Sequence, residues 1–424
     1  MNTSLKILAA ALGVALSAIR LQANEANYQH YILGDRAAGM GGAACAIANG
    51  VEAVYYNPAG LAGTPRDSLS LSANLYGFQK FTERNAFLPG EDFESDSFQS
   101  IPSSVGGTVR ASPDWVLGFG VFVPFRNTIF DGATYPADRH YYSVAIDNQT
   151  MWAGPAVGWQ ATPRLSLGLS VFGAYQTHSS LMNFYWGDEA LAYTRDIAYS
   201  SLGLVGVLGA QYRLTDRLRL GATLTSPCQR LMGEGNVTEN LVSGSAGEGS
   251  QSEVADYRDL AAENGSPASF RVGVSWGSER EFLLSADVAY HLSRTFDPLS
   301  GTSPEGEPVA VTQHHREVLD FSLGAEHYFR RKYPVRAGFF TSHSSAPDPD
   351  IEKTDEPGQI DLYGLTATVG VETKNASSNI GLNYLWGEGR ALGWGTDRNG
   401  EIVNTISDSN ETHLYLVFNT QYYF

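Results

Sequence analysis

Residues 165–175 read Leu-Ser-Leu-Gly-Leu-Ser-Val-Phe-Gly-Ala-Tyr and alternate apolar with small or polar side chains. Side chains of a β-strand point alternately to its two faces, so this segment has one apolar face and one small, polar face. Only Phe172 interrupts the second face. One face suits lipid and the other suits a lumen, as in the strands of a membrane barrel. The apolar face consists of Leu165, Leu167, Leu169, Val171 and Tyr175.

Two later segments repeat this pattern and gather their charges on one face. In residues 217–224 that face carries Arg217 and Arg219, and in residues 281–291 it carries Asp287. A soluble β-sandwich also alternates, but it turns its apolar face into the core and its charged face to solvent. Periodicity therefore predicts strands without separating a membrane barrel from a soluble all-β protein.

The lengths of the connections do separate these two classes. Bacterial barrels alternate short periplasmic turns with longer outer loops. Here tight joins such as Ser112-Pro113 alternate with long polar or Gly-rich joins, of which 77–100, 227–266 and 387–410 are expected to be outer loops. We predict an all-β protein, a transmembrane antiparallel β-barrel of about 14 strands. The strands are expected near 68–76, 101–111, 114–123, 142–160, 164–177, 198–214, 217–226, 267–277, 280–292, 315–329, 334–343, 361–372, 377–386 and 411–424.

Composition supports the barrel. Gly accounts for 45 of the 424 residues and aromatic residues for 12%, a profile that suits strands and turns better than a helical protein. After residue 23 no stretch approaches the roughly 20 apolar residues that a membrane-spanning helix needs. Without such helices, only a closed barrel satisfies the backbone hydrogen bonds of a chain in lipid.

Residues 1–23 have the features of a secretory signal peptide. Lys6 precedes the apolar run Ile7–Ile19, and cleavage is expected after Ala23. Lys6 and Arg20 are the only charges in this segment, so its removal takes the formal charge from −17 to −19 (−17 − 2). Nucleic acid is a poor partner for so acidic a chain.

Residues 24–67 show no sustained alternation and are predicted to form a hatch, a small plug inside the lumen. A stretch of mostly small residues at 37–46 can pack tightly, and the turn Asn57-Pro58-Ala59-Gly60 follows it. The glycines do not form a phosphate-binding loop, because no convincing strand precedes them and no Lys-Ser/Thr pair follows at the required spacing. The predicted division is 1–23 signal peptide, 24–67 hatch and 68–424 barrel.

The hatch segment resembles a known family. The runs 34–43 (Gly-Asp-Arg-Ala-Ala-Gly-Met-Gly-Gly-Ala) and 53–62 (Ala-Val-Tyr-Tyr-Asn-Pro-Ala-Gly-Leu-Ala) are similar to the N-terminal hatch of the FadL/TodX family of outer-membrane transporters for long-chain fatty acids and hydrophobic compounds. Ser112-Pro113-Asp114-Trp115 and Gly118-Phe119-Gly120 extend the resemblance into the third strand. The resemblance implies passive transport through a barrel plugged by the hatch, in the outer membrane of a Gram-negative bacterium.

The resemblance also implies a route. A groove among the outer loops would capture the substrate, a lumenal pocket would bind it, and a gap at a kinked third strand would release it sideways, because contact of apolar surface with water costs about 25 cal/mol per Å². The apolar residues proposed for capture could instead form an interfacial aromatic girdle. The kink could instead be ordinary barrel curvature. Candidates for capture are Leu181, Met182, Phe184, Tyr185 and Trp186; for the kink Gly118, Gly120 and Pro124, with Pro124 ending the strand; and for the hatch turn beside the gap Asn57, Pro58 and Ala59.

No residue pattern indicates catalysis, a cofactor or a metal. The pair His314-His315 lacks a second set of ligands at metal spacing, so both rings are expected to be solvated. Cys45 and Cys228 lie in an exported chain in which a disulfide could form, and the sequence leaves open whether they meet. Several charges with lumenal parity are expected to pair with one another: Arg217, Arg219, Arg271, Asp287, Asp320 and Glu326.

The expected partners are a hydrophobic small-molecule substrate, outer-membrane lipid and lipopolysaccharide, and the barrel-assembly machinery. The resemblance implies that this machinery recognises a last strand ending in an aromatic residue such as Phe424. The barrel is expected to be monomeric. Three rival functions stay open: a related barrel for protein export or another structural role, a general porin, and a soluble all-β enzyme or binding protein. A copurifying protein would favour the first of these functions, and steady ion conductance in planar bilayers the second. Extraction without detergent would favour the third.

Overall fold

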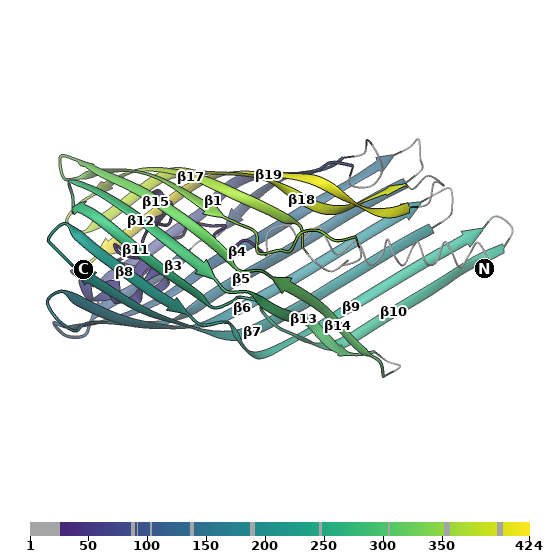
Figure 1. Cartoon of the computed structure of the whole chain (residues 1–424), viewed down its shortest axis with the longest axis horizontal. Coiled ribbons are helices and arrows are strands. Elements are labelled where there is room, and N and C mark those ends of the chain that lie inside the picture. Colours follow the sequence, from purple (N-terminus) through teal and green to yellow (C-terminus); the bar gives the residue numbers. More distant parts are fainter. Residues whose placement is uncertain are drawn as a thin grey trace.

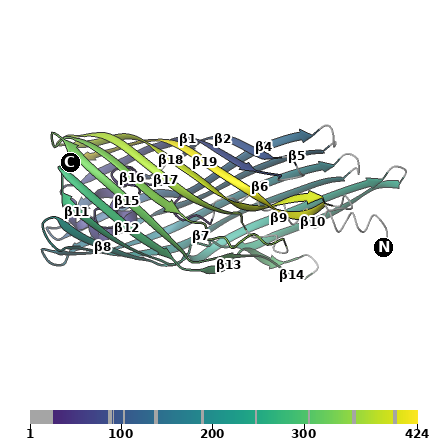
Figure 2. The same ribbon diagram turned by 45° about the horizontal axis from the view of Figure 1, so that its top comes forward.

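The computed structural model describes residues 26–85, 90, 92–101, 104–135, 140–186, 191–245, 248–303, 306–351, 357–396 and 402–424. In these residues the chain forms one antiparallel barrel of tilted strands, with short helical elements inside one end (Figures 1 and 2). The predicted all-β barrel is therefore confirmed. The predicted signal peptide lies outside the described residues.

The helical elements come first and the strands follow. The helical elements are η2 Ala37–Gly39, α2 Gly50–Tyr56 and η3 Pro58–Gly63. The strands are β1 Ser68–Glu83, β2 Phe93–Ile101, β3 Ser104–Arg110, β4 Trp115–Tyr135, β5 His140–Gln160, β6 Leu165–Trp186, β7 Leu191–Arg213, β8 Leu218–Thr225, β9 Gln229–Ser245, β10 Glu248–Ala262, β11 Ser269–Ser278, β12 Phe282–His291, β13 Arg294–Thr302, β14 Pro308–His315, β15 Val318–Phe329, β16 Tyr333–Ser342, β17 Gln359–Glu372, β18 Ala376–Thr396 and β19 Ile402–Tyr423.

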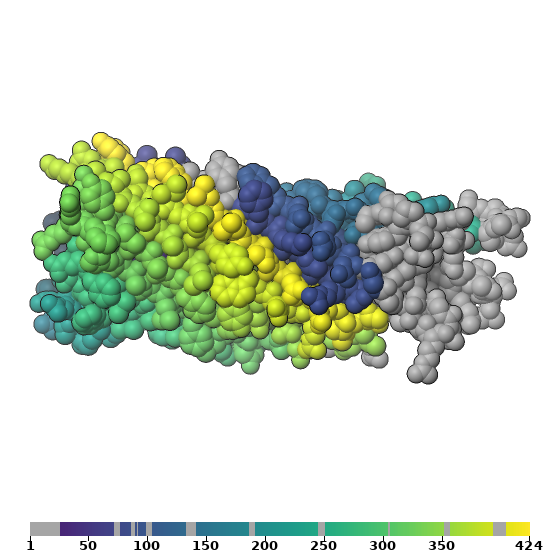
Figure 3. Space-filling view, turned by 90° about the horizontal axis from the view of Figure 1, so that it is seen from above, coloured from purple at the N-terminus to yellow at the C-terminus, as the bar shows by residue number. Residues whose placement is uncertain are grey.

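These 19 segments build a closed barrel of 14 strands, the predicted number, because five strands are interrupted once. For example, β2 and β3 both pair with β1, and β8 and β9 both pair with β7. The other interrupted strands are β10 with β11, β12 with β13, and β14 with β15. Pairing of β1 with β19 closes the barrel, and Figure 3 shows these C-terminal strands in yellow beside the N-terminal strands in dark blue.

The alternation of residues 165–175 has the predicted orientation. Val171 and Tyr175 of β6 are each 41% exposed on the outer surface, whereas Ser170 and Phe172 are fully buried. Near the tight turns, the outward rings of Trp115 and Trp159 stack 5.5 Å apart, as in the aromatic girdle of a membrane barrel. The apolar sides therefore face outward, which excludes a soluble sandwich with those sides in its core.

The prediction of long outer loops is wrong for much of the chain. Most of residues 77–100, 227–266 and 387–410 continues as paired strands, and β9 and β10 form one long hairpin that projects beyond its neighbours (Figure 1). Polar residues on both faces of a strand remain compatible with a β-ladder outside lipid, because water solvates either face. The alternation criterion therefore detected only the part of each strand that crosses the membrane.

Residues 26–67 lie inside the barrel, at the end that carries the tight turns (Figure 1). Several lumen-facing glycines of the wall let this hatch approach closely. A Cβ added at Gly168 would lie 2.2 Å from the carbonyl carbon of Pro58, and one added at Gly221 would lie 2.3 Å from the carbonyl oxygen of Cys45. Small wall residues thus leave room for the hatch, and they account for part of the high glycine content.

Both cysteines, Cys45 in the hatch and Cys228 in the wall, are buried and free, so no disulfide joins them. Among the described residues, no helix combines the length and the hydrophobicity that a membrane crossing requires. In the same part of the chain, no cluster of three or more His, Cys, Asp or Glu side chains has the arrangement of a metal site.

Candidate functional site

The hatch turn is fixed to the wall through Asn57. This side chain is fully buried. Its amide nitrogen donates to the carbonyl oxygens of Cys45 at 2.7 Å and of Ala210 in β7 at 3.1 Å, and its amide oxygen accepts from the backbone nitrogen of Ala59 at 3.2 Å. Pro58 follows as the first residue of η3, a position that needs no backbone donor. Asn57 therefore orders the turn and attaches it to the barrel.

A wall carboxylate binds the backbone of the hatch. One oxygen of Asp287 in β12 accepts hydrogen bonds from the backbone nitrogens of Ala44 and Cys45, both at 2.9 Å. The guanidinium of Arg271 lies 3.7 Å from the same oxygen and also donates to Gln29 at 3.0 Å. Arg271 and Asp287 both belong to the six lumenal charges of which several were expected to pair with one another.

A second ion-pair cluster joins the hatch to β15 and β16, and β15 is the strand next to β12 in the wall. Glu326 in β15 accepts hydrogen bonds from Arg36 of the hatch, at 2.5 and 3.1 Å, and from Arg336 of β16 at 2.7 Å. The side chain of Glu326 is 1% exposed. Two other predicted lumenal charges pair outside the predicted set: Arg219 with Glu279, and Asp320 with His343. The expectation of a lumenal position is wrong for Arg217, which is exposed in the turn before β8.

Glu52 makes hatch stability dependent on pH. Its carboxylate accepts hydrogen bonds from the backbone nitrogens of Arg36 and Ala37, at 2.9 and 3.0 Å. Burial, followed by the charge of Asp35, raises the pKa of Glu52 from 4.5 to about 7, although those two hydrogen bonds and the charge of Arg36 lower it. A raised carboxyl pKa stabilises the folded hatch below pH 4.5, and this contribution is lost as the pH rises through about 7.

We therefore expect the hatch to be more stable at pH 5 than at pH 8, by on the order of a few kcal/mol. Hydrogen exchange of the amides of α2, corrected for the intrinsic effect of pH, measures this difference. Glu52→Gln keeps a hydrogen-bond acceptor but does not titrate, so the difference between the stabilities of its hatch at the two pH values should be smaller than in the wild type. An unchanged pH dependence in this variant would contradict the assignment to Glu52.

Gly118 and Gly120 of β4 face the lumen and contribute space. A Cβ on Gly118 would lie 2.9 Å from a methyl carbon of Val54, and one on Gly120 would lie 2.4 Å from the ring of Phe122. The Phe122 ring in turn lies 5.2 Å from that of Tyr55 in the hatch. Both glycines therefore leave room for the hatch and for the aromatic residues beside it. This role differs from the predicted one, which was to kink the third strand.

The irregularity of the third barrel strand lies at Pro124. β4 continues to Tyr135, so the expectation that Pro124 ends the strand is wrong. The register with β5 shifts between the pairs Phe122–Trp152 and Phe125–Thr150, so that Val123 and Pro124 face one residue of β5. This is a β-bulge, which a proline tolerates because the extra residue need not donate to the ladder. Among the described residues, the ladder between β3 and β4 reaches as far as Phe122.

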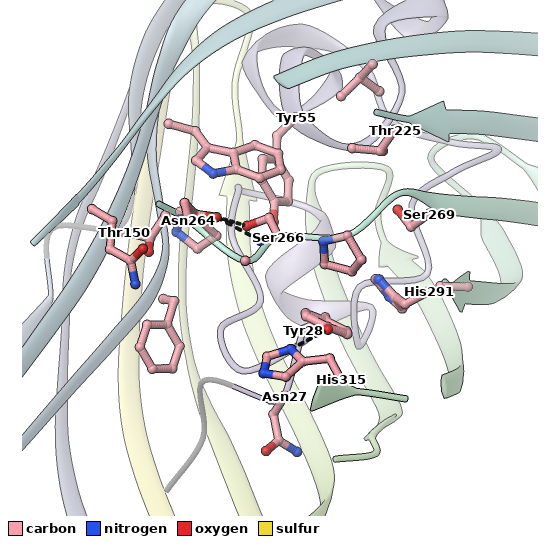
Figure 4. A pocket seen from close by; sticks show the side chains of 18 of the residues that line it. Asn27, Tyr28, Tyr55, Thr150, Thr225, Asn264, Ser266, Ser269, His291 and His315 are labelled. Carbon is pink, nitrogen blue, oxygen red and sulfur yellow. Dashed lines mark hydrogen bonds between the residues drawn. The ribbon is translucent and has the colours of Figure 1, made fainter. Parts of the chain in front are cut away.

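A cavity of about 160 Å³ lies in the lumen beside this bulge. In Figure 4, Tyr55 lies on one side of the segment that carries Asn264 and Ser266, and Tyr28, His291 and His315 lie on the other. Pro124 and Phe125 also line the cavity, so the bulge and the cavity are adjacent. The aromatic lining includes Tyr55, Phe125, Trp152 and Phe296, and the polar lining includes Tyr28, Thr150, Gln176, Arg271, His291 and His315.

Sequence reasoning missed most of the cavity. Tyr28 stacks on the ring of His291 at 4.6 Å, and its hydroxyl lies 2.9 Å from Nδ1 of His315. Burial raises the pKa of Tyr28 to about 12, so its hydroxyl keeps its proton. The expectation that His315 is solvated is wrong, because this side chain is 5% exposed. Nothing local in the sequence connects positions so far apart.

The predicted capture cluster does not lie in a loop. Residues 181–186 end β6, and the strand alternation divides them. Met182 and Phe184 face inward and are buried, whereas Leu181 and Tyr185 are exposed on the other face. The side chain of Trp186 lies outside the described part of the chain. The inward pair joins an apolar cluster near the outer end of the lumen that also contains Phe81, Phe93, Tyr142 and Val144.

A sequence comparison decides the family. The family described as outer membrane protein transport protein (OMPP1/FadL/TodX) matches residues 14–392. The chain belongs to this family. The resemblance seen in the hatch is thereby confirmed, and so is the predicted location in the outer membrane of a Gram-negative bacterium. Among curated proteins, none is similar enough in sequence to match.

Solved structures of FadL/TodX proteins share the fold. The Pseudomonas putida toluene transporter TodX is 16% identical, with a TM-score of 0.69 over 94% of this chain and 99% of that one. A Pseudomonas aeruginosa FadL homologue is 13% identical, with a TM-score of 0.63 over 93% and 100%. The Ralstonia pickettii toluene transporter TbuX is 16% identical, with a TM-score of 0.59 over 93% and 99%. At such identities the likeness concerns the fold alone.

Proposed function

We propose that this FadL/TodX-family barrel passively carries a hydrophobic small molecule, a hydrocarbon or a fatty acid, from the outer end of its lumen to the lipid of the outer membrane. The observation that supports this proposal most directly is the cavity, which is lined by aromatic residues and adjoins the bulge in β4. The solved relatives include proteins described as toluene transporters. No covalent step is needed, and transport follows the concentration gradient.

The first step is capture at the outer end of the lumen. Met182, Phe184 and Tyr142 belong to the buried apolar cluster there, and the ring of Phe93 lies 5.8 Å from that of Tyr142. Inward apolar side chains at this position shield a hydrophobic molecule from water as it leaves the outer surface, and each Å² of apolar surface removed from water contributes about 25 cal/mol. This inner cluster replaces the loop groove in the proposed route.

The second step is binding in the cavity, and the third is release at the bulge. Pro124 belongs both to the cavity lining and to the bulge, so a molecule in the cavity lies next to the irregular part of the wall. On the periplasmic side of the cavity the hatch blocks the direct path to the periplasm. Bonds made by Asn57, Asp287 and Glu326 hold the hatch to the barrel wall. Sideways release keeps the substrate in an apolar environment throughout.

Uptake of labelled toluene and palmitate into cells that lack the protein, with and without the cloned gene, tests the proposal. Restored uptake of at least one compound is expected. If neither compound enters faster while purified protein conducts ions steadily in planar bilayers, the chain acts as a porin and the proposal is wrong. If uptake is unaffected and a second protein copurifies with the barrel, these results favour a function in protein export.

Larger side chains at Pro58 or Gly120 are expected to lower uptake without unfolding the barrel. Gly120→Val drives the ring of Phe122 toward Tyr55 in the cavity lining, and Pro58→Leu disturbs a turn packed against Gly168 and Gly209. Uptake rates and the heat-dependent gel mobility of the folded barrel provide the two readouts. Gly63→Val is the control, since a Cβ at Gly63 meets no atom within 4 Å. Unchanged uptake in both variants would count against the route.

A further inference from the structure

The lumenal cavity is open on part of its boundary, and the space inside it suits a small ligand. It measures about 160 Å³, and an engineered protein cavity of roughly 150 Å³ binds benzene. One aromatic ring with a small substituent therefore fits. A long-chain acyl group exceeds this volume and would have to leave most of its carbons outside the cavity or displace wall and hatch residues.

The rings on one side of the cavity favour an aromatic ligand. The Tyr55 ring of the hatch lies 5.8 Å from the indole of Trp152 in β5, and that indole lies 5.5 Å from the ring of Phe172. Aromatic pairs at such separations gain energy from stacked or edge-to-face contacts beyond the burial of their surface. A ligand ring placed against Tyr55 and Trp152 extends this aromatic arrangement, whereas an alkyl chain gains only the burial.

The cavity also has polar atoms with no assigned partner. In the part of the chain that the structure describes, no hydrogen bond reaches Nε2 of His291, the indole nitrogen of Trp152 or the amide oxygen of Gln176, although all three atoms are buried. All three side chains line the cavity. Buried polar groups are nearly always hydrogen-bonded to protein, water or ligand, so each of these atoms needs a partner, which a polar group in the cavity can supply.

We propose that the cavity selects one-ring aromatic molecules that carry a hydroxyl group, in preference to bare hydrocarbons and long-chain fatty acids. This inference rests on the proposed function and specifies its substrate. A hydroxyl group both donates and accepts, so it can serve the indole N–H of Trp152, the amide oxygen of Gln176 or the imidazole of His291. A hydrocarbon forms no hydrogen bond with any of these atoms, which lowers its affinity relative to that of the alcohol.

Two fluorinated compounds of matched shape, 4-fluorobenzyl alcohol and 4-fluorotoluene, test the proposal by fluorine NMR. Each is titrated into the purified protein in lipid nanodiscs, and partition into empty nanodiscs is subtracted. The wild type should bind the alcohol more tightly. His291→Phe keeps a ring against Tyr28, so its affinity for the alcohol should fall about tenfold, as expected for one lost hydrogen bond, with little change for the hydrocarbon. His178→Phe is the matched control.

His178 is 2% exposed and stacks on Tyr199 at 4.7 Å, but it does not line the cavity. Its variant should bind both compounds like the wild type. Equal or tighter binding of 4-fluorotoluene by the wild type, or an equal loss in the two variants, would overturn the proposal. Tighter binding of palmitate than of either ring would overturn it while sparing the proposed function. Failure of all three to bind would count against the proposed function itself.

Discussion

Deletion of Pro124 is expected to abolish uptake while leaving a folded barrel. The bulge in β4 sets Val123 and Pro124 against a single residue of β5, between the pairs Phe122–Trp152 and Phe125–Thr150. Removing one residue from this position makes the register continuous without changing any other pair of this ladder. A regular strand then replaces the irregular wall beside the cavity, and a hydrophobic molecule in the cavity loses its sideways exit.

The control for this deletion is Pro124→Ala. Alanine keeps the extra residue and hence the register shift, but it removes the proline ring from the cavity lining, as the deletion also does. Uptake in the deletion variant should fall to that of cells without the protein, whereas Pro124→Ala should retain most of it. Heat-dependent gel mobility verifies folding in both. If the two variants transport equally, release does not depend on the bulge and the lateral route is wrong.

The membrane-crossing part of each strand was predictable because the bilayer imposes alternation. Leu169 and Val171 must face lipid, and Ser170 between them must face the lumen, so the two-residue period appears in the sequence. Where β6 leaves the membrane this constraint ends. Met182 and Phe184 then looked like part of a loop cluster, because both faces of the strand mix apolar and polar residues there.

The hatch turn was recognisable from Asn57 and Pro58, but the cavity was not recognisable from local signals. Its polar side combines Tyr28 of the hatch with His291 and His315 of two wall strands, and only the register of the closed barrel brings these positions together. At Pro124 the prediction of a strand end is wrong. A proline in a strand marks either an end or a bulge, and the sequence alone does not distinguish the two.

Replacing Glu326 by leucine is expected to release the hatch. Glu326 lies between the guanidinium groups of Arg36, on the hatch, and Arg336, on the wall, and its side chain is 1% exposed. Without it, two buried cations face each other with no shared anion, and breaking a buried ion pair in this way costs about 3–5 kcal/mol. Faster hydrogen exchange in α2 and a new ion conductance in planar bilayers should follow, since an unplugged barrel is an open pore.

Glu281→Leu tests whether burial, and not the loss of one negative charge, causes this effect. Glu281 binds Arg331 at 2.7 Å, the same distance as from Glu326 to Arg336. The side chains of Glu281 and Arg331, however, are both more than half exposed. An exposed ion pair contributes at most about 1 kcal/mol, so this variant should exchange and conduct like the wild type.

Adding Arg36→Met and Arg336→Leu to the Glu326→Leu variant removes the two unpaired buried cations and should restore the hatch in part, because well-packed apolar residues can replace a buried ionic triad. An equal conductance in the Glu281 and Glu326 variants would show that the triad does not hold the hatch.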